Sequence, residues 1–150
     1  NDNVFDGEEG VDLIFGGGGN DLMKLYQTDE SFDFDIYDGG TGEDTLYIQR
    51  DLNVPSFALE LSDIDVINIE IIELKNGATL NLTVDDLISV TDSDNTLMIK
   101  EFSVDSHVIT STGEGWVQGA DQTIDAELYH SYTFEMSTLL VDTDISQTVI

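Results

Sequence analysis

Cysteine is missing from this chain of 150 residues, and basic residues are scarce. Four lysines and arginines face 32 aspartates and glutamates, which gives a formal net charge of −28. Without cysteine there is no disulfide framework, no thiolate nucleophile and no thiolate metal ligand. Without clustered Lys and Arg, nucleic acid and anionic membrane surfaces are excluded as partners. Self-repulsion on this scale opposes compaction, and bound cations would relieve it.

Long apolar runs are also missing. No run approaches the length that spans a bilayer, and no signal peptide is recognisable at the start, so we expect no membrane insertion. Hydrophobic residues make up 40% of the chain, enough for one domain with a substantial core. The chain starts at Asn1, without an initiator Met and within what looks like a repeat. We therefore expect a fragment of a longer protein.

Glycine is concentrated in a short repeat near the start of the chain. Residues 16–24, GGGGNDLMK, and 39–47, GGTGEDTLY, fit the nonapeptide G-G-x-G-x-D-x-U-x at every constrained position, where U is apolar. Residues 7–15, GEEGVDLIF, lack only the second glycine, and Asp2 followed by Val4 looks like the tail of an earlier copy. In each copy, a six-residue glycine turn can direct carbonyl oxygens towards an aspartate, and a short strand follows. Hard oxygen ligands of this kind suit Ca²⁺.

Successive turns are expected on alternate sides of the coil, so that each ion lies between one turn and the next but one. We predict Ca²⁺ between the Asp2 and Asp21 turns and between the Asp21 and Asp44 turns. The alternative is a flexible acidic linker, and the interleaved apolar positions argue against it. The predicted metal-binding residues are Asp2, Gly7, Gly10, Asp12, Gly16, Gly17, Gly18, Gly19, Asp21, Asp29, Gly39, Gly40, Thr41, Gly42 and Asp44.

The chain departs from the nonapeptide between the second and third of these copies. Residues 32–36 alternate apolar and acidic side chains, which predicts a half-buried strand with its aspartates facing outward. Residues 27–31 then form a degenerate turn on the opposite side of the coil. A weaker cation site is predicted there, between the Asp12 turn and Asp29 or Glu30.

The repeats resemble those of the RTX (hemolysin-type) family of calcium-binding β-roll proteins, over residues 1 to about 48. The resemblance implies a parallel β-roll, a secreted or bacterial cell-surface location, and export by a type I secretion apparatus. On this basis the turns are expected to stay disordered where free Ca²⁺ is low and to fold outside the cell.

The nonapeptide does not recur from residue 51 onward. The only proline, Pro55, lies in a plausible junction between the repeats and the rest of the chain. We predict a β-roll over 1–50 and a β-rich C-terminal capping segment over 51–150. Thr83 is a candidate N-cap for a short helix over 83–90, and Asn76-Gly77 predicts a turn. The fold class expected is therefore mostly β, with one short helix. Strands are expected at 57–61, 67–74 with a shift of phase, 79–82, 96–100, 107–112, 115–119, 128–136 and 138–141.

Several blocks between residues 64 and 145 resemble the C-terminal segment of large bacterial RTX adhesins, which carries the type I secretion signal. They are NIEIIEL at 68–74, LNLT at 80–83, TDSDNTL at 91–97, GW at 115–116 and LLVD at 139–142. The resemblance implies a non-catalytic calcium-binding module at the C-terminal end of a secreted adhesin. Two alternatives stay open: the calcium-dependent folding domain of an exoenzyme such as a lipase or protease, or a ligand-binding module in 51–150.

The remaining polar clusters give weaker signals. Asp92 and Asp94 form either an extra cation site or a plain Asx turn. His107 and His130 are far apart, which argues against a catalytic zinc site, and no G-x-S-x-G elbow is present. We therefore expect no enzyme activity in this segment. Trp116 is expected to anchor a core or, as the alternative, to mark a sugar-stacking surface.

Overall fold

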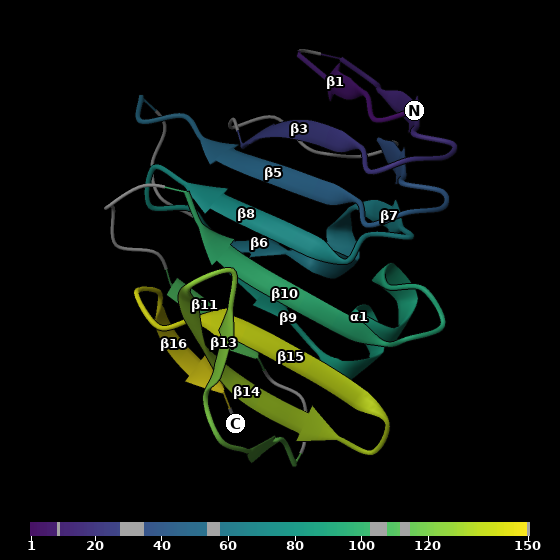
Figure 1. Cartoon of the computed structure of the whole chain (residues 1–150). Helices are drawn as coiled ribbons and strands as arrows, with labels where there is room; N and C mark the ends of the chain where they lie inside the picture. The colour runs from purple at the N-terminus through teal and green to yellow at the C-terminus, as the bar shows by residue number, and fades with distance from the viewer. Residues whose placement is uncertain (9, 28–34, 54–57, 103–107, 112–114, 150) are drawn as a thin grey trace.

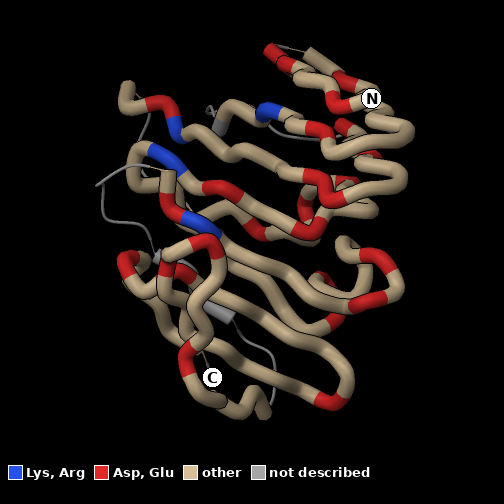
Figure 2. The backbone as a smooth tube through the Cα atoms, in the orientation of Figure 1, with Lys and Arg blue, Asp and Glu red and all other residues tan. Residues whose placement is uncertain are grey.

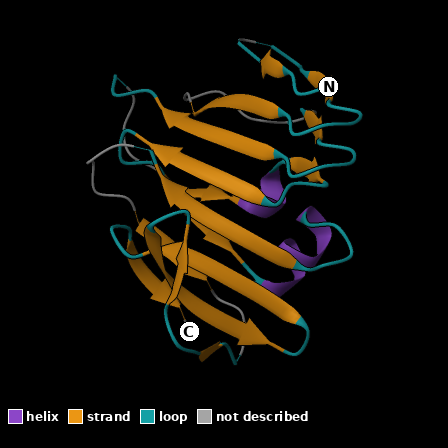
Figure 3. Ribbon diagram, viewed as in Figure 1, coloured by secondary structure: helices purple, strands orange, loops and turns teal. Residues whose placement is uncertain are grey.

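The chain winds as a coil that passes alternately between one large sheet and two smaller sheets behind it (Figures 1 and 3). The computed structural model describes every residue except 9, 28–34, 54–57, 103–107, 112–114 and 150. The expected fold class is confirmed: the protein is mostly β, its sheets are largely parallel, and it has a single α-helix among the described residues.

The large sheet contains nine strands, six of which are mutually parallel. In chain order these six are β1 (Val4–Asp6), β3 (Leu22–Gln27), β5 (Thr45–Arg50), β8 (Ile71–Lys75), β10 (Thr96–Glu101) and β15 (Ser137–Asp142). The antiparallel strand β14 (Glu127–Phe134) covers β15 and pairs in turn with β12 (Val117–Gln118) and β13 (Gln122–Ile124).

The two smaller sheets are wholly parallel. One contains β2 (Leu13–Phe15), β4 (Ile36–Asp38) and β7 (Asp65–Ile67) in that order. The other has the order β16-β11-β9-β6, with β6 at Ala58–Glu60, β9 at Thr79–Leu82, β11 at Val108–Ser111 and β16 at Ser146–Val149.

The core lies between the sheets and is built from side chains in register. Because side chains alternate along a strand, one residue in two of the large sheet points inward. One inward column runs through five neighbouring strands, and each of its side chains is completely buried: Met23, Leu46, Ile72, Ile99 and Val141. From the other side, the smaller sheets contribute Ile14, Tyr37, Val66, Leu59, Leu80 and Leu82.

The predicted helix is confirmed as α1 (Val84–Val90). Thr83 is its N-cap: the Thr83 hydroxyl accepts the N–H of Asp86 at 3.2 Å, and the Asp86 carboxylate accepts the N–H of Thr83 at 2.7 Å. This capping box satisfies two of the donors that a helix start leaves unpaired. A short 3-10 helix spans Leu61–Asp63. Among the described residues, no helix has both the length and the apolar character needed to cross a bilayer.

The predicted continuous strand over 67–74 is wrong. Strand β7 ends at Ile67, Asn68 takes a φ of 55°, and β8 begins only at Ile71. The shift of phase marks a corner at which the chain crosses from one sheet to another. The predicted Asn76-Gly77 turn is confirmed, with φ of 61° and 69°, and it carries the chain from β8 to β9 in a different sheet.

The large sheet runs through the predicted boundary at residue 50. Strands β5 and β8 pair in parallel from Thr45 and Ile71 to Gln49 and Lys75. The division into 1–50 and 51–150 stays a prediction, but the two parts share a sheet and a hydrophobic core. The glycine turns precede β3 and β5, so this sheet also fixes how the turns stack.

Candidate metal centre

The two complete glycine turns, 16–21 and 39–44, lie one above the other at the amino ends of β3 and β5. The N–H of Thr41 donates to the carbonyl of Gly17 at 3.0 Å, and the N–H of Gly19 donates to the carbonyl of Thr41 at 3.0 Å. The amino group of Asn1 donates to the carbonyl of Gly18 at 2.6 Å. The prediction that the start of the chain and the two complete turns meet at one edge is thus confirmed.

The register predicted for the first copy is wrong by one residue. Val4 pairs with Leu22 rather than with Met23, and Val4 is 65% exposed while Phe5 packs against the core. Asn3 therefore occupies the position equivalent to Asp21. Asp2 is exposed and accepts the N–H of Asn20 through Oδ1 at 3.0 Å. The larger Phe5 ring takes the inward position that the sequence pattern assigned to Val4.

A ladder of three carboxylates runs along this edge, with Asp21, Asp44 and Glu70 directly before β3, β5 and β8. The N–H of Asn3 donates to Oδ1 of Asp21 at 2.7 Å, and the N–H of Asp21 donates to Oδ1 of Asp44 at 2.7 Å. The N–H of Asp44 then donates to Oε2 of Glu70 at 2.8 Å. Figure 2 shows acidic residues recurring where successive strands begin. Glu70 was missed by the sequence analysis, because it lies outside any nonapeptide.

Two carboxylate oxygens of this ladder are buried and, among the residues that the structure describes, have no hydrogen-bond partner. The side chains of Asp21 and Asp44 are 2% and 0% exposed, and Oδ2 of each has no hydrogen-bond partner within the described part of the chain. An unpaired buried carboxylate is costly unless a proton or a cation accompanies it. Their Oδ2 atoms therefore mark the points at which a positive charge would be most stabilising.

Each Oδ2 atom faces a glycine and a backbone carbonyl of the next turn. A Cβ atom placed on Gly16 would meet Oδ2 of Asp21 at 2.5 Å and collide with the carbonyl of Gly39. On Gly39 it would meet Oδ2 of Asp44 at 2.7 Å and collide with the carbonyl of Asn68. Only glycine fits these two positions, because the oxygen atoms occupy the space of a side chain. We call the two arrangements the repeat cradle and the corner cradle.

The electrostatics of the ladder follow from burial and like charge. Burial raises the pKa of Asp44, the N–H of Asp21 partly offsets this, and the neighbouring Asp21 and Asp38 raise it further. Burial likewise raises the pKa of Glu70, and the N–H of Asp44 partly offsets that rise. Without a cation, burial therefore makes the ionised forms of Asp44 and Glu70 less favourable than they are in an exposed chain.

The opposite edge of the coil holds a smaller arrangement around Asp12. Its N–H donates to Oδ1 of Asp35 at 3.0 Å, and Asp35 is only 7% exposed, so the prediction that Asp35 faces solvent is wrong. Oδ2 of Asp12 lies 3.0 Å from the Cβ position of Gly7. Burial, and then Asp35 and Glu8, raise the pKa of Asp12. The predicted partner Asp29 lies outside the described residues, and this site stays a prediction.

Most of the other predicted glycines allow backbone conformations in the turns that other residues rarely adopt. Gly10, Gly17, Gly19, Gly40 and Gly42 all have a positive φ. For Gly42 a side chain would also collide with the carbonyl of Gly19, so the close stacking of the turns requires glycine there.

The Asp92–Asp94 cluster forms the Asx turn that the sequence offered as one alternative. The N–H of Asp94 donates to Oδ1 of Asp92 at 2.8 Å, and both side chains are exposed. The turn joins α1 to β10, and because aspartate side chains stabilise turns of this kind, the turn alone explains why aspartates occur here. An additional cation here stays a prediction.

The donor set at the glycine turns limits what they could bind. Within the described residues, no three histidine, aspartate or glutamate side chains gather around one point. A cation here would therefore be held by one or two carboxylates together with backbone carbonyls. All of these are hard oxygen donors, which suit Ca²⁺ better than Zn²⁺. The residues present thus fit the predicted calcium.

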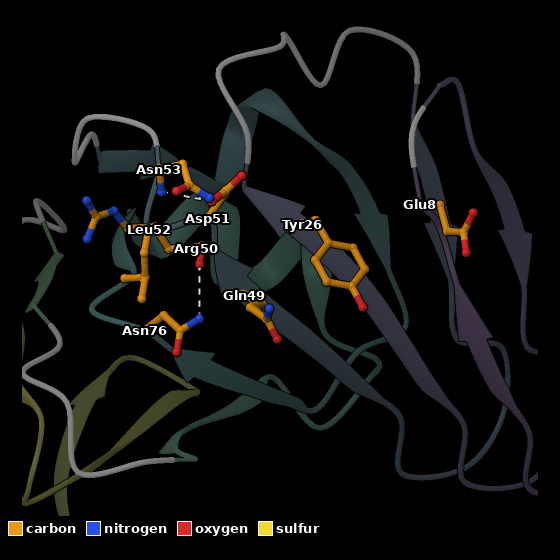
Figure 4. A pocket seen from close by; sticks show the side chains of 8 residues that line it. All are labelled: Glu8, Tyr26, Gln49, Arg50, Asp51, Leu52, Asn53 and Asn76. Carbon is orange, nitrogen blue, oxygen red and sulfur yellow. Dashed lines mark hydrogen bonds between the residues drawn. The ribbon is translucent and has the colours of Figure 1, made fainter.

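A separate hollow of about 410 Å³ lies at the other ends of β3 and β5 (Figure 4). Its polar groups are largely engaged in local structure: Asn53 donates twice to Oδ1 of Asp51 at 2.8 Å, and Asn76 donates to the carbonyl of Arg50 at 3.2 Å. The lining residues are Glu8, Tyr26, Gln49, Arg50, Asp51, Leu52, Asn53 and Asn76.

The histidine and tryptophan predictions concern the C-terminal half. His130 lies in β14 and contacts Oδ1 of Asp121 at 2.8 Å through Nδ1, while its neighbour Ser131 is buried and points to the other face of the strand. His107 lies outside the described residues. Trp116 is partly buried against the core and meets Phe134 edge to face at 6.4 Å, which confirms its role as an anchor.

Neither the protein-family models nor the curated proteins and solved structures that were compared with this chain give a match.

Proposed function

We propose that this chain is a non-catalytic, calcium-binding folding module whose glycine turns order around Ca²⁺. One observation carries the proposal. Asp21 and Asp44 occupy equivalent positions in stacked turns, and each keeps a buried, unpaired carboxylate oxygen beside a carbonyl of the next turn. In a chain with a net charge of −28, a bound cation is the neutralising group that this arrangement suits best.

The residues of the repeat cradle would hold the ion. Oδ2 of Asp21 and the carbonyl of Gly39 come from different turns, so a shared cation would join the two turns directly. When bound, Ca²⁺ supplies the positive charge that this pair of oxygen atoms lacks. The other oxygen of this carboxylate, Oδ1 of Asp21, accepts the N–H of Asn3 and so holds the start of β1 beside the turn.

The state without calcium follows from the same contacts. The aspartates of the ladder repel one another, and five glycines of the turns must be fixed at positive φ, which is entropically costly. Low calcium therefore favours an unfolded chain. For extracellular calcium modules, dissociation constants are on the order of 10⁻⁴ to 10⁻³ M. Calcium well above that range would contribute about 1 kcal/mol or more per site.

The biological setting is also part of the proposal. The resemblance of residues 1 to about 48 to the RTX family, and of residues 64–145 to the C-terminal segment of RTX adhesins, supports a role at the C-terminal end of a secreted adhesin. There the calcium-free chain would pass unfolded through a type I secretion apparatus and fold at the bacterial surface or outside the cell. The shared sheet supports coupled folding, because β5 offers a preformed parallel edge to β8.

The test is a calcium titration followed by circular dichroism and thermal unfolding of the full chain. We expect calcium to raise both the β signal and the Tm, EDTA to reverse the change, and equimolar Mg²⁺ to do much less. The variant Asp21→Asn keeps an oxygen for the N–H of Asn3 but should lose most of the calcium response. Asp63→Asn, an exposed change of equal charge, is the control. A wild-type chain that unfolds at the same temperature in calcium and in EDTA would refute the proposal.

A further inference from the structure

The corner Asn68–Glu70 occupies the place of a third glycine turn. Strand positions Phe15, Asp38 and Ile67 are paired in register, so the residues that follow them, Gly16, Gly39 and Asn68, are equivalent. The N–H of Gly16 donates to the carbonyl of Asp38 at 2.8 Å, and the N–H of Gly39 donates to that of Ile67 at 3.1 Å. Glu70 is likewise equivalent to Asp21 and Asp44, because it directly precedes β8.

This corner is a shortened turn that keeps the inner positions. Gly39 and Asp44 are five positions apart in sequence, whereas Asn68 and Glu70 are two apart. The outer loop, which carries the glycines in the complete turns, is missing. What remains is the carbonyl at the position of the first glycine and the carboxylate at the position of the aspartate.

Resting on the function proposed above, we propose that the corner cradle is a second calcium site, formed by Oδ2 of Asp44 and the carbonyl of Asn68. The Asp44 side chain is completely buried, and its Oδ2 has no hydrogen-bond partner among the described residues. Both oxygens crowd the Cβ position of Gly39, as their counterparts crowd that of Gly16. The site extends calcium binding beyond the nonapeptides.

Two side chains position the corner. Asn68 tolerates its φ of 55° better than most residues, and its Nδ2 donates to Oδ1 of Asp38 at 2.7 Å, which fixes the direction of its carbonyl. Glu70 accepts the N–H of Asp44 through Oε2 and brings a second negative charge close to the cradle. We assign Glu70 as a positioning residue for Asp44.

An ion at this place would connect the repeats to the helix. Ile69, between the two positioning residues, is completely buried, and its N–H donates to the carbonyl of Val90 in the last turn of α1 at 3.0 Å. Within the described part of the chain, the repeat cradle has no such link to the helix. Occupancy of the corner cradle would therefore stabilise the region after residue 51 as well as the turns.

The test uses the full chain labelled with ¹³C and ¹⁵N, with a stabilising osmolyte that keeps it folded before calcium is added, so that folding itself does not move the resonances. Calcium is then titrated into the folded chain. The carbonyl ¹³C resonances of Gly39 and Asn68 report the repeat cradle and the corner cradle separately, and we expect both to move. Movement of Gly39 alone would overturn the corner site and leave the proposed function intact. If neither carbonyl responds and equilibrium dialysis detects no bound calcium, the proposed function fails as well.

A pair of variants tests the role of Glu70. Glu70→Ala removes the charge and also the acceptor for the N–H of Asp44, so we expect affinity at the corner cradle to fall by on the order of tenfold while the repeat cradle is unchanged. Glu73→Gln removes the same charge within β8, three residues further on, and should change neither. If both variants weakened calcium affinity at the corner cradle equally, the effect of Glu70 would come from its contribution to net charge alone. That result would contradict its assignment as a positioning residue.

Discussion

The N–H of Asp21 donates to Oδ1 of Asp44 at 2.7 Å, so two acidic residues 23 positions apart hold the stacked turns together through a backbone bond. The bond satisfies one oxygen of Asp44 and leaves the like charges close to each other. Burial further disfavours the ionised form of Asp44. The contact is therefore favourable in geometry and unfavourable in charge. A cation or a proton that neutralises the pair should therefore increase stability, because the hydrogen bond remains while the repulsion between the two carboxylates is removed.

One consequence concerns pH. In the calcium-free protein the pKa values of Asp12, Asp44, Glu70 and Glu73 are all raised, with burial as the largest cause. For an acid whose pKa is higher in the folded state, the folded state binds more protons, so stability falls as pH rises from the ordinary pKa through the raised value. We expect the free energy of unfolding in the absence of metal to decrease as pH rises above the ordinary carboxyl values of 3.8 to 4.5 and through the raised ones.

The measurement is urea unfolding at several pH values, after exhaustive removal of metal and again in excess calcium. Calcium should flatten or reverse the trend, because protons and the cation compete for the same oxygens. A metal-free protein whose stability increases up to neutral pH would show that these carboxyl groups are not buried as described.

A second consequence concerns the glycines. Gly39→Ala places a methyl group against the carbonyl of Asn68 and 2.7 Å from Oδ2 of Asp44, so we expect it to cost at least about 1–3 kcal/mol. Gly18→Ala is the matched control, because Thr41 Oγ1 at 3.3 Å is its only near contact and its φ is not positive. We expect that change to alter stability by less than about 1 kcal/mol.

Both variants should be compared in calcium, by thermal unfolding and by calcium affinity. Equal effects from the two alanines would mean that glycine is needed for flexibility in general rather than for the closely placed oxygens.

A third consequence concerns cooperativity. Leu46 of β5 is completely buried in the core that runs through both halves of the chain, so Leu46→Ala should cost about 2–5 kcal/mol. Because the sheet is continuous, the change should lower the Tm seen by the fluorescence of Trp116, which lies in the C-terminal half. Circular dichroism and tryptophan fluorescence should give one coincident transition in calcium.

The control for this prediction is Leu128→Ala, at a 44% exposed position of β14, which should have a much smaller effect. If Leu46→Ala leaves the Trp116 transition in place, residues 1–50 and 51–150 unfold independently.

Much of the fold could be predicted from local sequence signals. The helix follows from Thr83 and Asp86, whose capping box is a local arrangement of side chains and backbone. The stacking of the turns follows from the fixed spacing of the nonapeptide. These features depend on residues close in sequence or on an exact repeat, which is why the sequence is enough to identify them.

The errors have physical causes of another kind. Asn3 rather than Asp2 is equivalent to Asp21, because the size of Phe5 decides which residue faces the core. Asp35 is buried although alternation placed it outside, since the N–H of Asp12 provides a partner for it. The roles of Asn68 and Glu70 could be found only from the pairing of strands that are distant in sequence. A glutamate just before an apolar strand was the only available signal.

The antiparallel pairing of β14 with β15 has a consequence for self-association. A parallel coil whose last strand stayed open would offer a template on which further chains could add indefinitely, as in a fibril. Here the returning strand β14 is covered in turn by β12 and β13, which are only two and three residues long, so the edge left at this end of the large sheet is short. A short edge offers few backbone hydrogen bonds to an incoming chain, so growth at that end of the large sheet is disfavoured.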